Sequence, residues 1–190
     1  RTVIAAEFPA WQPHPDVLLV VGLLVAGYAI ALTRLGPRFV APGAAVATRF
    51  QVASFGLGAF AVLLAAAWPM HDLAEGYLYS VHMVQHLTFT MIAAPLLLMG
   101  TPVWLARWLL RPAPLFRVVR SLSRFLPALI VFNVVIVVAH WPAVVDLTLR
   151  SALAHVVAHT VLLLSAFLIW MPIVSPLPEI PRLPAMLQNV

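Results

Sequence analysis

Apolar runs of membrane-spanning length are the feature that most constrains this sequence. A transmembrane helix needs about 20 mostly apolar residues, because the hydrocarbon core of a bilayer is about 30 Å thick. The chain of 190 residues is 63% hydrophobic and 9% charged, whereas soluble domains average about 25% charged residues. We therefore predict an all-α polytopic bundle that forms one transmembrane domain over residues 1–190. Its five predicted spans are residues 16–35, 51–68, 77–100, 125–140 and 151–172.

The positions of the basic residues predict how the spans cross the membrane. All 11 basic residues are arginines. Those in the connections after the first and third spans are Arg34, Arg38, Arg49, Arg107, Arg111, Arg117, Arg120 and Arg124. Aromatic residues alternate with arginines over residues 103–124, which is typical of an interfacial segment. Because arginine-rich loops stay in the cytoplasm, the amino terminus is expected outside, and the positive charge indicates topology rather than nucleic-acid binding.

Two of the predicted spans carry a pair of histidines near their start. His82 and His86 lie in the third span, and His155 and His159 lie in the fifth. A spacing of four residues puts both imidazoles of a pair on one face of an α-helix. Ionisable groups inside a membrane are costly, so we favour a functional role for them over hydrogen bonding between helices.

The third span combines its histidines with a stripe of polar and aromatic residues. On a helical wheel, the side chains within about 80° of His82 are Tyr79, Gln85, His86, Phe89, Thr90 and Ala93. Val84, Leu87 and Leu98 point in other directions. We therefore expect the stripe to face protein rather than lipid.

The remaining histidines lie at the same predicted outer end of the bundle. His14 precedes the first span, His71 follows the second, and His140 closes the fourth. Asn133 lies seven residues before His140 and is expected to extend this polar face inward. The residues expected to give a metal ion its way in, or to serve as additional ligands, are His71, His140, His14 and Met70.

The available donor atoms limit which metal ion or cofactor the histidines could bind. Imidazole is a good ligand for copper, zinc and haem iron, and thioether sulfur adds a preference for Cu⁺. The chain has no cysteine and only six acidic residues, so a closed zinc site and a site for hard cations are disfavoured. Copper and haem therefore remain as the candidates for what the histidines bind. No phosphate-binding loop, Ser/His/Asp arrangement or HExxH motif is present, so we expect no enzymatic activity.

The histidine-bearing segments also resemble a known family. The run HMVQHLTFTMIAAPLLLMGTP at 82–102, the HWPAVVD segment at 140–146 and the span at 151–174 are similar to the CtaG-type cytochrome c oxidase assembly factors. The resemblance implies a multi-pass protein of the bacterial plasma membrane that takes part in the maturation of haem–copper oxidases and in their copper supply. Members usually have about seven spans, so further chain is expected beyond Val190.

This resemblance carries the family's histidines over to positions of this chain. They fall on His82, His86, His155 and His159, with His71 and His140 as weaker candidates. We therefore predict that the first four bind copper weakly at the outer side of the membrane and pass it to oxidase subunits.

Three alternatives stay open at this point. A b-type membrane cytochrome would hold haem between histidines on facing helices, although the alanine-rich faces beside His155 favour close packing over a wide haem slot. A structural accessory subunit of a respiratory complex would use the histidines only for bonds between helices. A copper permease would need polar residues to continue the path through the cytoplasmic half, which lacks them.

Overall fold

The computed structural model describes residues 13–76, 79–180 and 182, and every regular element in that part of the chain is helical. The first helix, α1 (Pro15–Ile30), continues through the π-helical η1 (Ala31–Leu35) and the 3₁₀ turn η2 (Gly36–Arg38). The third span is built from α4 (Tyr79–Leu87), the π-helical η3 (Thr88–Ala93) and α5 (Ala94–Met99). The other helices are α2 (Arg49–Ala66), α3 (Met70–Gly76), α6 (Val103–Leu109), α7 (Ala113–Leu122), α8 (Phe125–Ala139), α9 (Pro142–Arg150) and α10 (Ala152–Val174).

All five predicted spans correspond to helices. Among the described residues, the helices long and apolar enough to cross a bilayer alone are Pro15–Arg38, Arg49–Ala66, Tyr79–Met99 and Ala152–Val174. The fourth predicted span is α8, whose 15 residues extend about 22 Å. It meets α7 at an angle of 86°, and the pair qualifies as a fifth span only when the two are taken together. The all-α polytopic bundle is therefore confirmed.

Local sequence signals explain where several helices begin. Thr48 and Gln51 form a capping box at the start of α2, in which each side chain bonds the backbone amide of the other residue. Ser151 caps α10 by accepting a hydrogen bond from the amide of Ala154. Because Ser151 fixes where α10 begins, it also fixes the depth of the two histidines that follow in its first turns.

Two connections between the spans contain short helices. Residues 70–76 form α3 after the second span. Residues 142–150 form α9, which Pro142 opens and in which Arg150 donates to Asp146 one turn earlier over 3.0 Å. The predicted interfacial segment, residues 103–124, contains α6 and α7. Residues 175–180 are not helical, which agrees with the presence of Pro176 and Pro178.

A π-helical segment in the third span is hydrogen-bonded to α10. In η3 the amide of Ala94 donates to the carbonyl of Phe89, five residues back. The next carbonyl in this pattern, that of Thr90, would require an amide hydrogen on Pro95, and proline has none. The indole Nε1 of Trp170 donates to the Thr90 carbonyl instead, over 2.7 Å. The bond satisfies this carbonyl and fixes the register of α10 against the third span.

Glycines allow α2 to approach the third span closely. A β-carbon on Gly100 would lie 2.4 Å from the backbone nitrogen of Phe55, and one on Gly58 would lie 2.9 Å from the Leu97 side chain. Tyr28 stacks on Phe55 with ring centroids 3.7 Å apart and donates its hydroxyl to the Gly100 carbonyl over 2.7 Å. These contacts hold α1, α2 and α5 together around a shared apolar core.

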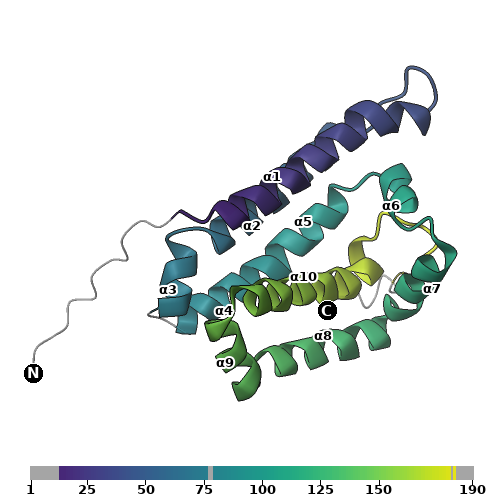
Figure 1. Ribbon diagram of the computed structural model, residues 1–190. Coiled ribbons are helices and arrows are strands. Elements are labelled where there is room, and N and C mark those ends of the chain that lie inside the picture. Colours follow the sequence, from purple (N-terminus) through teal and green to yellow (C-terminus); the bar gives the residue numbers. More distant parts are fainter. Residues whose placement is uncertain (1–12, 77–78, 181, 183–190) are drawn as a thin grey trace, which may run out of the picture.

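The two ends of the bundle differ in chemistry. Figure 1 shows α3, the start of α4 and α9 at one end, and α6, α7 and the connection between η2 and α2 at the other. The first of these ends carries the histidines, and the second carries the arginine-rich connections. The predicted separation of the two residue types is therefore confirmed.

Gly100→Ala should destabilise the protein much more than Gly56→Ala. The first substitution forces a methyl group against the backbone of Phe55, and overpacking of this kind costs about 1–3 kcal/mol. Nothing lies within 4 Å of a β-carbon built on Gly56, which makes it the matched control. Thermal unfolding in detergent measures both variants, and equal stabilities would contradict the close approach of α2 and α5.

Cysteine labelling in intact cells tests the orientation predicted from the arginines. Ala143 in α9 and Ala113 in α7 are both exposed, and the chain has no cysteine of its own. An impermeant thiol reagent should label Ala143→Cys at once and Ala113→Cys only after the membrane has been permeabilised. Labelling of Ala113→Cys alone would place the histidine end in the cytoplasm.

Candidate metal centre

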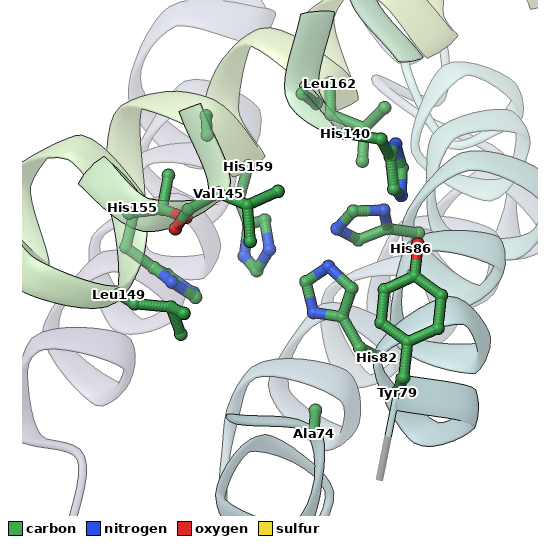
Figure 2. Close-up of a pocket in the computed structure, with 13 residues that line it drawn as sticks. Ala74, Tyr79, His82, His86, His140, Val145, Leu149, His155, His159 and Leu162 are labelled. Atoms are coloured by element: carbon green, nitrogen blue, oxygen red, sulfur yellow. The ribbon is translucent and has the colours of Figure 1, made fainter. Parts of the chain in front are cut away.

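Histidines from three separate segments line one cavity at the arginine-poor end. The cavity measures about 320 Å³ and lies between α3, α4, α9, α10 and the end of α8 (Figure 2). Its polar lining residues are Tyr79, His82, His86, His140, Thr148, His155 and His159. The described residues that line it include no Asp, Glu or Arg, so imidazole is its main polar group.

The third-span histidines lie on one face of α4, as their spacing predicted. The ring centroids of His82 and His86 are 4.1 Å apart. The neighbouring Gln85 is fully buried and donates its side-chain amide to the carbonyl of Ala65 over 2.9 Å. This bond ties α4 to the last turn of α2 and so holds His86 in the cavity wall.

The fifth-span histidines reach the same cavity from α10. The ring centroids of His155 and His159 are 4.3 Å apart, and His159 lies 5.3 Å from His86 and 6.2 Å from His82. The predicted convergence of the third and fifth spans is therefore confirmed. Figure 2 shows the imidazoles of His82, His86 and His159 pointing toward one another across the cavity.

His140 adds a third imidazole close to the third-span pair. Its Nδ1 lies 2.8 Å from the carbonyl oxygen of Ile136, which is an acceptor only, so Nδ1 must carry the proton. Its Nε2 is therefore left with a lone pair, and this buried atom has no hydrogen-bond partner among the described residues. Fixing one ring nitrogen by a backbone carbonyl is how proteins orient a histidine that binds metal.

Three of the cavity histidines are close enough to share one ion. One nitrogen from each of His82, His86 and His140 lies within 4.8 Å of the other two. His86 is 8% exposed, and both of its ring nitrogens are buried without a partner among the described residues. Buried polar atoms are normally hydrogen-bonded, so such orphaned nitrogens fit a site for an added ligand.

The outer histidines form a chain that leads to this cavity. His14 contacts the Asp72 carboxylate over 3.1 Å, and its ring centroid lies 4.6 Å from that of His71. His71 lies in turn 5.4 Å from His155. These contacts connect the histidines for which a role in metal entry was predicted, and that role stays a prediction. Met70 is half-buried one residue before His71 and does not line the 320 Å³ cavity.

Three residues lie elsewhere than their helical-wheel positions predicted. Asn133 is exposed and donates to the carbonyl of Leu129 in its own helix, so it does not extend the polar face inward. Tyr79 is 65% exposed at the first residue of α4, although it lines the cavity. Leu98, expected off the stripe, is buried against Leu177 because the segment after α10 folds back over α5. The rest of the stripe, from Gln85 to Ala93, faces protein on the side of the histidines as predicted.

Residues of α9 form one wall of the cavity, a position that the sequence did not indicate. Val145, Thr148 and Leu149 all line it. The available signals were Pro142, which favours the first turn of a helix, and the Asp146–Arg150 pair four residues apart. These signals predict a helix but not the cavity that it covers.

Several helices are long and apolar enough to cross a membrane, and a histidine-lined cavity lies near one end of the bundle. These features define the class of this molecule, a polytopic all-α membrane protein with a histidine cluster. The chain belongs to the cytochrome c oxidase caa3 assembly factor family (Caa3_CtaG), whose family model matches residues 26–190. The resemblance inferred from the histidine-bearing segments is thereby confirmed. No curated protein and no solved structure matches the chain.

In the metal-free protein, His140 should be protonated at Nδ1 and bare at Nε2, because the Ile136 carbonyl accepts from Nδ1. ¹⁵N spectra of protein labelled at histidine measure the tautomer directly, and His140→Ala assigns the signal. A proton on Nε2 of neutral His140 would contradict the orientation of this ligand.

Proposed function

We propose that this protein binds copper at its histidine cluster and delivers it to a haem–copper oxidase during assembly. The observation that carries the proposal is the convergence of His82, His86 and His140, whose ligand atoms lie within 4.8 Å of one another. The ring nitrogens of His86 and the Nε2 of His140 are also buried without a partner among the described residues. A membrane protein of an oxidase assembly family that gathers imidazoles in this way is well suited to carry the metal of that oxidase.

The donor chemistry supports copper over other metal ions. Mg²⁺ and Ca²⁺ prefer oxygen ligands, and the described residues that line the cavity include no carboxylate. Structural zinc sites are usually closed by four ligands, often thiolates, and this chain has no cysteine. Imidazole suits copper in both common oxidation states. A site made of a few neutral imidazole ligands also binds the ion weakly enough to release it, as a carrier must.

The outer face of the bacterial plasma membrane is the proposed place of delivery. The arginine-rich α6 and α7 lie at the end opposite the histidines, and the positive-inside rule assigns that end to the cytoplasm. The amino terminus and the histidine cluster would then face outward, where subunits of the oxidase can accept copper. In this role the protein exchanges ligands on an ion and catalyses no covalent reaction.

Haem remains the alternative that a measurement must exclude. A haem bound by two histidines needs them on opposite faces of a flat slot. The ring centroid of His86 lies 5.2 Å from that of His140 and 5.3 Å from that of His159, whereas two imidazoles on opposite sides of one iron would be about 6 Å apart. This arrangement favours a small ion surrounded by imidazoles over a macrocycle between two of them.

Replacing His86 and His159 together should remove most copper binding, because it removes one member of the three-histidine group together with a nearby imidazole that could take its place. Oxidase from cells with this double variant should be deficient in copper, while the variant itself stays folded in the membrane. Asn133→Ala is the matched control, since Asn133 is an intramembrane polar residue that does not line the cavity. Elemental analysis of purified oxidase and of the purified protein measures both effects.

The visible spectrum of the purified wild-type protein separates the alternatives. A stoichiometric haem Soret band without copper would replace the proposal with a b-type cytochrome. Neither haem nor measurable copper affinity, together with normal oxidase in the double variant, would leave the histidines as bonds between helices in a structural partner.

A further inference from the structure

We infer that the cavity histidines have two separate tasks, an inference that rests on the proposed function. His82, His86 and His140 form a holding site that binds the ion at equilibrium. His155 and His159 form a relay pair that moves the ion between this site and the outer group of His14, His71 and Asp72. The sequence had suggested instead that the four histidines of the third and fifth spans bind one ion together.

The distances between nitrogens support the holding site. When three nitrogen ligands lie in a plane around one ion, each about 2 Å from it, the nitrogens are about 3.5 Å from one another. The nitrogens of the holding site lie within 4.8 Å of one another, so a small rotation of the rings closes the site. His155 and His159 are both described residues, but neither belongs to a group of three or more possible ligands that lie this close together in the described part of the chain.

The relay pair stands between two cavities. His155 and His159 line the 320 Å³ cavity, and both also line a second cavity of about 270 Å³ between α1, α2, η3 and α10. His71 lines only the second cavity, whereas the three residues of the holding site line only the first. An ion that passes from one cavity to the other therefore meets these two imidazoles on the way.

Each step along this route is short enough for direct exchange between ligands. An ion bound by two imidazoles separates their ring centroids by at most about 6 Å, because each metal–nitrogen bond is about 2 Å long. The successive centroid distances are 5.4 Å from His71 to His155, 4.3 Å to His159 and 5.3 Å to His86. The ion can thus gain its next ligand before it loses the previous one.

The distribution of charge favours loading from the outer group. Asp72 contacts His14 at the start of the route, and Asp16 lines the second cavity. Carboxylates attract a cation and raise its local concentration there. The first cavity offers no carboxylate among its described lining residues, so the holding site depends on the number of imidazoles and not on charge.

The experiment compares equilibrium and kinetics of Cu⁺ binding to the full chain in detergent. His140→Ala should weaken the affinity for Cu⁺, measured by competition with a chromogenic chelator, by at least about tenfold, because even the outer-shell partners of metal ligands are worth that much. The double variant His155→Ala/His159→Ala should keep an affinity close to that of the wild type. Stopped-flow transfer to and from the chelator should nevertheless be slowed several-fold in the double variant.

Two further variants keep the test decisive. His140→Asn retains a side-chain nitrogen at the position of Nδ1 that can donate to the Ile136 carbonyl, so its loss of affinity reports the missing ligand and not a disturbed fold. Val157→Ala in α10 alters an exposed side chain that lines neither cavity and should change neither affinity nor rate.

The possible failures are distinguishable. A double variant that loses as much affinity as His140→Ala would show one shared site and overturn the division of tasks, while copper binding itself would stand. Unchanged rates in the double variant would overturn the relay in the same way. A wild-type chain that binds no Cu⁺ at all would overturn the proposed function and this inference with it.

Discussion

The hydrogen bond from Trp170 to the Thr90 carbonyl is the contact on which the histidine cluster depends. Pro95 removes the amide that would otherwise bond this carbonyl, and the π-helical turn leaves it open to the indole. The bond sets how α10 lies against the third span. A slip of one residue would move α10 by about 1.5 Å and rotate it by about 100°, which would turn His159 out of the cavity. The same backbone irregularity that weakens the third span as a helix therefore aligns the two histidine pairs.

Several polar side chains inside this bundle bond backbone carbonyls. Gln85 and Trp170 each donate to a carbonyl of another helix, and His140 donates to its own helix. In a membrane such bonds are valuable because no water replaces them. By contrast, both ring nitrogens of His86 and the Nε2 of His140 are buried without a partner among the described residues, and both side chains line the same cavity. This contrast supports a metal site rather than a set of bonds between helices.

The sequence predicted the spans and the histidine end of the bundle well because both follow from local rules. Membrane length and hydropathy locate the helices, and the separation of arginines from histidines assigns the residues to two ends. The closeness of His140 to the third-span histidines was not predicted, because it ends α8 in a non-helical conformation that a helical wheel does not represent. The same limitation explains Asn133, which shares the nominal face of His140 on the wheel but lies exposed. Leu98 was misjudged because the segment that covers it is remote in sequence.

By itself, the sequence determined that this chain is a helical membrane protein, that its histidines lie at one end, and that they resemble those of an oxidase assembly family. Each of these depends on residue type, spacing or order along one segment. Only the tertiary structure decided which imidazoles approach one another, that α9 walls the cavity, and that His155 and His159 stand between two cavities. Those features depend on the rotation and depth of helices relative to one another. Contacts between residues that are distant in sequence fix this rotation and depth. Here Gly100 lies against the backbone of Phe55, and the Trp170 indole donates to the Thr90 carbonyl.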